Sequence, residues 1–132
     1  MDLKDELGLT YLYITHDLAS GRFVCDRLAI LYLGQMVEWG DAVDLYDDPQ
    51  HPYTTSLLGA IPLPDPSRKG RDRQLPHGEI PDALTPPAGC RFHPRCPRAM
   101  EVCRREVPRL KPAADGHQVR CWLHDEQAKA AS

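Results

Sequence analysis

Long apolar stretches are absent from this sequence of 132 residues, since no run approaches the roughly 20 residues that a membrane-spanning helix needs. The N-terminus, Met1–Leu7, is acidic and has no apolar segment, so we expect it not to be a secretory signal. A Gly-X-Y period is also absent, which excludes a collagen-like chain. Hydrophobic residues make up 42% of the chain, too many for a wholly disordered polypeptide.

Proline is absent from residues 1–48, and all 13 prolines fall between Pro49 and Pro112. Charge divides in a similar way: residues 1–66 contain 3 Lys/Arg and 11 Asp/Glu, whereas residues 67–132 contain 13 and 8. Four of the five cysteines lie in the second half. The chain therefore joins two different kinds of polypeptide, and we expect a sizeable core only from its first ~60 residues.

The first residues predict a strand between two helices. Residues 9–15 (LTYLYIT) are apolar on both alternating faces, which indicates a strand covered on both sides, as in parallel sheets. Gly8 is well placed to end a helix over residues 2–7. Asp17 or Thr15 is expected to cap a second helix that runs to about residue 25.

A hairpin and two short helices are expected next. Residues 28–33 and 36–39 are predicted to be the strands of the hairpin, with Gly34-Gln35 as a two-residue turn. Helices are expected over residues 42–46 and 53–60.

Prolines and turns dominate the sequence that follows. Residues 62–66 predict a stiff extended linker, and residues 67–74 a charged exposed stretch. Beyond them, the pattern leaves room only for a short helix near residues 97–104.

His16 is the first candidate for chemistry. It follows the predicted buried strand where a helix begins, the place where open α/β sheets carry their ligand sites. A histidine there can donate a hydrogen bond to a developing phosphate charge. It can equally serve only to cap the helix, and position alone does not separate the two interpretations.

Three stretches resemble a known family. Residues 13–18 (YITHDL) and 25–40 (CDRLAILYLGQMVEWG) resemble the H-loop and the following strands of an ABC transporter ATPase subunit. Residues 49–58 (PQHPYTTSLL) resemble the segment peculiar to the oligopeptide/dipeptide and nickel importer branch. With the cysteine-bearing tail, the resemblance covers nearly the whole chain.

The resemblance implies roles for particular residues. His16 would be the H-loop histidine, which contacts the γ-phosphate of ATP and helps to position the attacking water, so it is the catalytic and nucleotide-binding residue expected here. Asp17 would support that loop or only cap the helix. Tyr53, Leu57 and Leu58 are expected to be packing residues.

The other ATPase motifs are missing from this sequence. It has no G-x-x-x-x-G-K-[ST] loop, no Leu-Ser-Gly-Gly-type signature and no apolar strand ending in the Asp-Glu pair that holds magnesium. We therefore expect this sequence to be the carboxyl-terminal part of a longer ATPase, produced by truncation, a late start codon or an incomplete gene. ATP and Mg²⁺ are expected only in the intact subunit, and no ATPase activity is expected from this chain alone.

Four cysteines form a second candidate site with the spacing C-x5-C-x6-C-x17-C: Cys90, Cys96, Cys103 and Cys121. Four soft thiolates in a turn-rich segment suit zinc or an iron–sulfur cluster. Zinc is the weaker choice because structural zinc sites favour C-x2–4-C pairs. The resemblance implies a four-iron four-sulfur cluster, while disulfides, disfavoured in a cytosolic chain, and free thiols remain open.

Other side chains near these cysteines bear on the site. Six arginines are expected to offset the negative charge of a thiolate cluster: Arg91, Arg95, Arg98, Arg104, Arg105 and Arg120. Three histidines are alternative ligands, although each is more typical of an ordinary surface histidine: His93, His117 and His124.

The expected fold class is α/β: the C-terminal end of an ABC-type nucleotide-binding domain (parallel strand, hairpin, short helices), followed by a loop-rich, cysteine-containing extension. Residues 1–48 are assigned to the end of the ATPase core with the H-loop. Residues 49–66 are the oligopeptide-family helix segment and proline-rich linker, and residues 67–132 are the cysteine-rich extension.

The expected function is a fragment of the ATP-binding subunit of an ABC peptide importer, which couples ATP hydrolysis to oligopeptide or dipeptide uptake in the intact protein. Its expected partners are permease transmembrane subunits, a second ATPase subunit and, indirectly, an extracytoplasmic peptide-binding protein. Its expected place is cytoplasmic, peripheral on the inner face of the cell membrane.

The alternative is a stand-alone small metal-binding module, iron–sulfur or zinc, with an interaction or redox role. Nucleic acid is not expected as a partner, because the arginines cluster around the cysteines rather than forming a stripe interleaved with aromatics.

Overall fold

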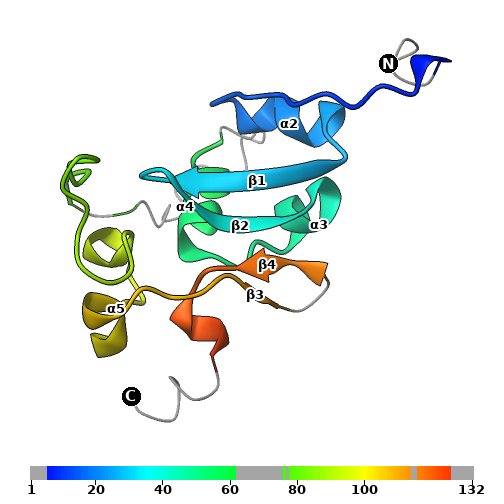
Figure 1. The fold of residues 1–132 in the computed structure, drawn as a ribbon. Helices are drawn as coiled ribbons and strands as arrows, with labels where there is room; N and C mark the ends of the chain where they lie inside the picture. The colour runs from blue at the N-terminus through cyan, green and yellow to red at the C-terminus, as the bar shows by residue number, and fades with distance from the viewer. Residues whose placement is uncertain (1–5, 62–75, 77, 114–115, 126–132) are drawn as a thin grey trace, which may run out of the picture.

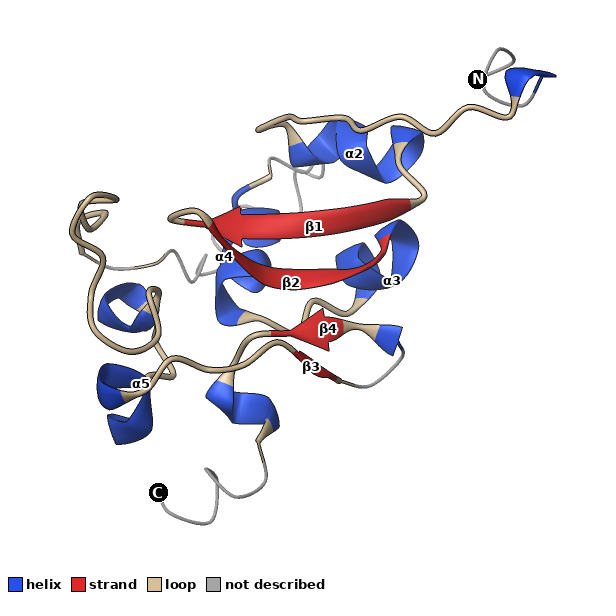
Figure 2. Ribbon diagram, in the orientation of Figure 1, coloured by secondary structure: helices blue, strands red, loops and turns tan. Residues whose placement is uncertain are grey.

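The computed structural model describes residues 6–61, 76, 78–113 and 116–125. Its strands form one antiparallel sheet in the order β1-β2-β4-β3 (Figure 1), with β1 at Arg27–Tyr32, β2 at Gln35–Asp41, β3 at Lys111–Pro112 and β4 at Gln118–Val119. Short helices surround it (Figure 2): α2 at Leu18–Val24, α3 at Ala42–Asp47, α4 at Pro52–Ala60 and α5 at Glu101–Arg105. Among the described residues there are also the 3-10 turns η2 at His93–Arg95 and η4 at Trp122–His124.

The mixture of helices with a sheet agrees with the expected α/β class, but the prediction of a parallel strand over residues 9–15 is wrong. That segment is extended and unpaired, and it runs out from the body of the molecule (Figure 1). Leu12 is 89% exposed and Ile14 is 87% exposed. A strand with two apolar faces needs other elements packed against both faces. No element in the described part of the chain covers either face of this segment.

Helix α2 begins as its sequence predicts. Asp17 is its N-cap, and the Asp17 side chain accepts a hydrogen bond of 3.0 Å from the Ala19 N–H. Thr15 supports the cap, because its hydroxyl oxygen accepts from the Asp17 N–H at 2.9 Å. An ion pair of 3.0 Å between Arg22 and Asp47 joins α2 to α3.

The hairpin between β1 and β2 is confirmed, but its turn lies one residue earlier than predicted. The turn residues are Leu33 and Gly34, with φ of 47° and 73°, rather than Gly34 and Gln35. A two-residue turn with two positive φ values matches the right-handed twist of the strands that it joins. Leu33 adopts a positive φ because Tyr32 pairs with Gln35, so Leu33 and Gly34 are the two residues that must make the turn.

Helices α3 and α4 lie on one face of the sheet (Figure 1). The Asp41 carboxylate caps α3 by accepting from the Val43 N–H at 2.9 Å. Pro52 occupies the first turn of α4, and the His51 ring caps this helix by accepting from the Tyr53 N–H at 3.0 Å. The short helix expected near residues 97–104 is α5, which begins later, at Glu101.

The core contradicts the expectation that it comes only from the first ~60 residues. Its buried cluster contains Ile30, Tyr32, Val37, Leu45 and Phe92, and Phe92 comes from the cysteine-bearing region. The Phe92 ring lies 5.2 Å from the ring of Tyr32 and 5.3 Å from the ring of Tyr53. As expected, Tyr53 and Leu57 pack against this core. The two halves of the chain therefore share one core.

Some expectations fall on residues that the structure does not describe. The linker over residues 62–66, the charged stretch over residues 67–74 and most of the helix over residues 2–7 lie outside the described residues. Within the described part, no helix is long and apolar enough to cross a membrane.

Candidate functional site

His16 stands exposed immediately before the cap of α2. Because the Asp17 side chain makes the capping hydrogen bond, the start of the helix does not depend on the His16 ring. The structure therefore removes the helix-capping interpretation of His16 and leaves its ring in solvent. An exposed imidazole at a helix start can donate a hydrogen bond to an anion that approaches it.

The four cysteines of the C-x5-C-x6-C-x17-C pattern come from turns and short helices around the left end of the sheet as drawn in Figure 1. Cys96 ends η2, Cys103 lies in α5, and Cys121 precedes η4. The Cys90 N–H donates to the Cys103 carbonyl oxygen at 2.8 Å, which joins two of the cysteine segments directly. All four side chains are half-buried or buried.

Gly89 permits that close approach of Cys90 to α5. Its φ is +70°, and a Cβ built at this position would lie 2.4 Å from the Cys103 carbonyl oxygen. No side chain fits there, so residue 89 has to be glycine for the two cysteine segments to meet.

The pKa values of the thiols show that the four cysteines share one neighbourhood. Burial raises the pKa of Cys121 to about 12, with smaller contributions from the nearby thiols of Cys90, Cys96 and Cys103. Burial likewise raises the pKa of Cys90 and of Cys96. For Cys90, Cys96 and Cys121, burial and the neighbouring thiols therefore both favour the protonated form.

The four thiols suit a thiolate-bound metal group in chemistry, but not in their arrangement. All five cysteines of the chain, Cys25 at the end of α2 included, are free thiols. Among the described residues, however, no group of three or more His, Cys, Asp or Glu side chains is arranged to hold a metal ion. The expected zinc or iron–sulfur site is therefore not confirmed.

The arginines around the cysteines have roles other than the one expected of them as a group. Burial leaves the pKa of Cys96 raised, and the backbone N–H and the charge of Arg98 oppose that rise only in part. Arg91 and Arg120 instead donate to backbone carbonyl oxygens of the β1–β2 hairpin. Arg104 and Arg105 pair with the Glu101 carboxylate at 4.0 and 2.7 Å.

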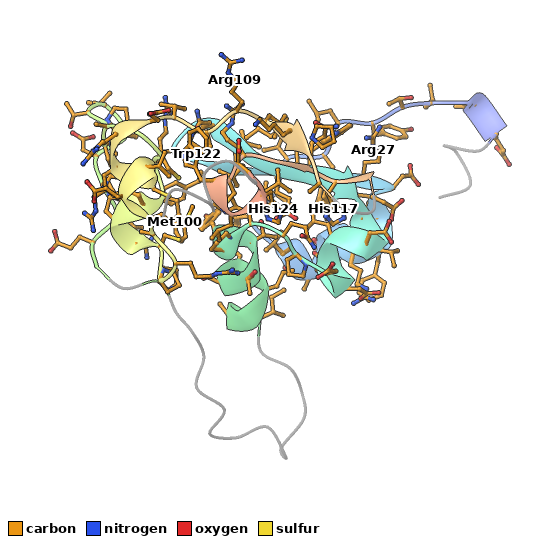
Figure 3. All side chains as sticks on the ribbon, turned by 90° about the horizontal axis from the view of Figure 1, so that it is seen from below. Arg27, Met100, Arg109, His117, Trp122 and His124 are labelled. Carbon is orange, nitrogen blue, oxygen red and sulfur yellow. The ribbon has the colours of Figure 1, made fainter. Side chains whose placement is uncertain are left out.

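The three candidate histidines have partners other than a thiol: two face backbone carbonyl oxygens, and the third lies beside a buried carboxylate. His93 Nδ1 lies 2.9 Å from the Cys90 carbonyl oxygen, and His124 Nε2 lies 2.9 Å from the Gln50 carbonyl oxygen. His117 is only 1% exposed, so the expectation of a surface histidine is wrong for it. Figure 3 shows His117 and His124 within the body of the molecule, whereas Arg109 projects away from it.

A buried polar cluster joins β2 to the start of α4 and to β4. Glu38 is fully buried, and its two carboxylate oxygens accept from the Gln50 N–H at 2.7 Å and the His51 N–H at 3.0 Å. His117 Nδ1 lies 3.4 Å from the same carboxylate. Gly40 leaves room for the His117 ring, because a Cβ there would lie 2.8 Å from His117 Cδ2.

Sequence reasoning missed this cluster. The pairing of β1 with β2 passes from Ile30 opposite Glu38 to Leu31 opposite Met36, which leaves Val37 without a partner. Alternation along β2 is therefore interrupted next to Glu38, and the pattern does not say which way the Glu38 side chain points. The usable signal is the HPY segment itself, since His51 directly before Pro52 stands at a helix start, where side-chain acceptors are preferred.

A cavity of about 520 Å³ opens beside Cys121, and Cys121 and Trp122 are among its lining residues. The Trp122 indole N–H donates to the Glu106 carbonyl oxygen at 3.0 Å across this region. The lining of this cavity contains both carboxylates and cationic side chains: Glu106, Asp125, Arg109 and Lys111. Its charge therefore favours neither anionic nor cationic ligands.

Comparisons with known proteins show the family of this chain. Residues 37–103 match the family described as the oligopeptide/dipeptide transporter, C-terminal region. These residues include β2 from Val37 onward, α3, α4 and three of the four cysteines. The chain belongs to this family.

Similar proteins carry names of the same kind. A peptide import ATP-binding protein of Brucella ovis is 48% identical over 120 residues, which cover 91% of this chain and 38% of that relative. A peptide ABC transporter ATP-binding protein of Sinorhizobium fredii is 45% identical over 130 residues, 98% of this chain and 36% of the relative. The chain thus spans little more than a third of the length of the relatives that it matches.

Proposed function

We propose that this chain is the C-terminal part of the ATP-binding subunit of an ABC peptide importer, which couples ATP hydrolysis to oligopeptide or dipeptide uptake in the intact protein. The observation that carries the proposal is the similarity to peptide import ATP-binding proteins along nearly the whole chain. The chain covers only 38% of the Brucella ovis relative and has no phosphate-cradling loop, so we propose that it is inactive alone.

His16 is proposed as the H-loop residue that contacts the γ-phosphate. Its exposure and the independent capping by Asp17 support this role, because both leave the ring available to a nucleotide. ATP supplies the phosphoryl group and Mg²⁺ neutralises its charge when bound in the intact subunit. The contribution of this chain is one hydrogen-bond donor directed at the phosphate that is transferred.

We propose that the four cysteines hold a four-iron four-sulfur cluster, with zinc as the less favoured occupant. The neighbourhood of the four thiols supports this assignment, and so does the Arg98 charge beside Cys96. Binding has to release protons, because burial raises the pKa of three of these thiols. The residues that would hold the cluster are Cys90, Cys96, Cys103 and Cys121.

The division of the chain follows from the same proposal. Residues 1–48 complete the ATPase core, residues 49–66 carry the helix segment and linker of the peptide importer branch, and residues 67–132 form the cysteine-bearing extension. The proposed partners are the permease subunits, a second ATPase subunit and, indirectly, a peptide-binding protein outside the membrane, with the subunit on the cytoplasmic face. A stand-alone metal module is less well supported, since the similarity to peptide import ATP-binding proteins extends along nearly the whole chain.

The test of the catalytic role is His16→Ala in the intact ATP-binding subunit. We expect nucleotide affinity to be retained and turnover to fall by about 100-fold or more, the usual effect of losing a positioned proton donor or acceptor. Asp17→Asn is the matched control, because asparagine caps a helix as well as aspartate does. Wild-type turnover in His16→Ala, measured by phosphate release, would remove His16 from the mechanism.

The test of the cluster is anaerobic purification, followed by visible absorption and by iron and sulfide assays. We expect a brown protein that loses its colour when Cys103 is replaced by serine. A colourless protein with stoichiometric zinc would contradict the iron–sulfur assignment.

A further inference from the structure

Two of the arginines in the extension stand directly beside the first and last cysteines of the four. Arg91 follows Cys90, and Arg120 precedes Cys121. Arg91 Nη1 donates to the Leu33 carbonyl oxygen, a contact that spans 58 residues of sequence. Arg91 thus connects a cysteine-bearing loop to the turn of the β1–β2 hairpin.

Arg120 makes the corresponding contact from the other side. Its Nε–H donates to the Met36 carbonyl oxygen at 2.9 Å, 84 residues away, and its Nη1 donates to the Pro108 carbonyl oxygen at 3.0 Å. The Arg120 backbone N–H also donates to the Val37 carbonyl oxygen at 2.8 Å. Leu33 and Met36 lie within three residues of each other around the hairpin turn, so both arginines hold the same structure.

We propose that Arg91 and Arg120 are positioning residues that assemble the four-cysteine site on the tip of the β1–β2 hairpin. Each one fixes the backbone next to a cysteine by a charge-assisted bond to a hairpin carbonyl. The positioning role rests on the proposed cysteine site, because it explains how that site is assembled. The hydrogen bonds of the two arginines are observed whether or not the cysteines bind a cluster. The partner of the two arginines is the backbone of the hairpin rather than the charge of a thiolate.

The rest of the site needs no further long-range anchor. Cys90 and Cys103 are joined by the backbone hydrogen bond between them, and Cys96 is carried by the short turn that follows Cys90. Cys121, in contrast, lies 17 intervening residues beyond Cys103 and reaches the group from β4. The Arg120 contacts hold the backbone next to Cys121 and so keep this last cysteine near the other three.

Arg104 provides a matched comparison for the two clamping arginines. It also stands directly beside a cysteine, Cys103, but its guanidinium pairs with Glu101 on the same helix and is 62% exposed. If arginines act here by offsetting thiolate charge, Arg104 should matter as much as Arg120. If they act by holding the hairpin, it should not.

The experiment measures how readily Cys90 and Cys121 join. The full-length protein is prepared reduced and metal-free, and it carries Cys25→Ser, Cys96→Ser and Cys103→Ser. Cys90 and Cys121 then remain as the cysteines of this region. Diamide oxidises the two thiols to a disulfide and takes up the two electrons and two protons, and mass spectrometry follows the cross-linked peptide. The rate reports the effective concentration of one thiol at the other.

We expect Arg91→Gln and Arg120→Gln each to slow cross-linking by about tenfold, because each removes the bond that holds one partner in place. Arg104→Gln should change the rate by less than about twofold. Arg120→Lys should be as slow as Arg120→Gln, because an ammonium keeps the charge but does not reproduce the fork that reaches two carbonyl oxygens. Circular dichroism and the urea midpoint show whether each variant is folded.

Three outcomes overturn the proposal: equal slowing by Arg104→Gln, a wild-type rate in Arg120→Lys, or slowing that appears only in variants that have unfolded. Iron content of the protein with all four cysteines is measured separately. If that protein binds no iron while the cross-linking pattern is as expected, the cluster assignment fails and the positioning role stands. If it binds iron and the arginine variants cross-link at the wild-type rate, the positioning role alone fails.

Discussion

Buried polar side chains fix the joint between β2 and α4. The Glu38 carboxylate, fully removed from solvent, accepts two backbone N–H bonds from Gln50 and His51. A buried carboxylate without such partners costs several kcal/mol, on the order of 3–5 when a partner is removed. The His51 ring in turn accepts the first free N–H of α4, so two side chains connect strand, loop and helix.

The ionisation of His51 makes this joint sensitive to acid. Burial, with the charge of His124, lowers the pKa of His51 to about 3 from an ordinary value near 6.5. The folded state thus favours neutral His51, and the unfolded state binds a proton first as the pH falls. Stability from this group is complete above pH 6.5 and is lost as the pH falls toward 3, by about 1.4 kcal/mol per pH unit.

We therefore expect the free energy of unfolding, measured in urea, to fall by about 2 kcal/mol more between pH 7 and pH 5 in the wild type than in His51→Asn. Asparagine retains a side-chain acceptor for the Tyr53 N–H and does not titrate. Parallel pH dependence in the two proteins would contradict the assignment to His51.

The β1–β2 hairpin contacts the core, strand β4 and the cysteine-bearing region. Its strands supply Ile30, Tyr32 and Val37 to the core, its second strand pairs with β4, and the carbonyls around its turn accept from Arg91 and Arg120. The turn depends on two residues with positive φ, which only glycine adopts without strain.

Two glycine substitutions should therefore shift stability in opposite directions. Gly34→Ala is expected to lower the free energy of unfolding by about 1–2 kcal/mol, because alanine is strained at a φ of +73°. Gly59→Ala, in α4 with nothing within 4 Å of the added Cβ, is expected to raise it by up to about 0.5–1 kcal/mol. Urea unfolding at pH 7 measures both, and a stabilising Gly34→Ala would contradict the turn described here.

In the whole molecule, the two compositional halves of the chain fold on one core. Phe92 is 1% exposed among Tyr32, Tyr53 and His51, although it lies next to Cys90 and Arg91 in the proline-rich half. Val119 is equally buried and brings β4 onto β2. The cysteine-bearing extension is consequently part of the body of the structure.

Removing the Phe92 ring should loosen both halves together. We expect Phe92→Ala to lower the free energy of unfolding by about 3–5 kcal/mol, since a fully buried ring leaves a cavity. Phe23→Ala is the control: Phe23 is 76% exposed, and its loss should change stability by less than about 0.5 kcal/mol. Separate unfolding of the cysteine region and the hairpin, seen by hydrogen exchange, would contradict a shared core.

Local sequence signals predicted the elements that depend on local chemistry. The cap at Asp17, the short helices α3 and α4 and the hairpin itself all follow from residues within a few positions of each other. His16 and the four cysteines were likewise identified by spacing and resemblance. The prediction of a strand over residues 9–15 failed because a strand exists only where a neighbour pairs with it.

The sequence by itself determined the start of α2, the presence of α3 and α4, the hairpin, the family and the identity of the candidate site residues, because short-range hydrogen bonds and residue spacing encode them. Only the tertiary structure decided that Phe92 belongs to the core, that Glu38 and His117 are buried together, and that Arg91 and Arg120 donate to carbonyl oxygens of the hairpin. These contacts join residues tens of positions apart. Their formation depends on the packing of the whole chain, which no local pattern records.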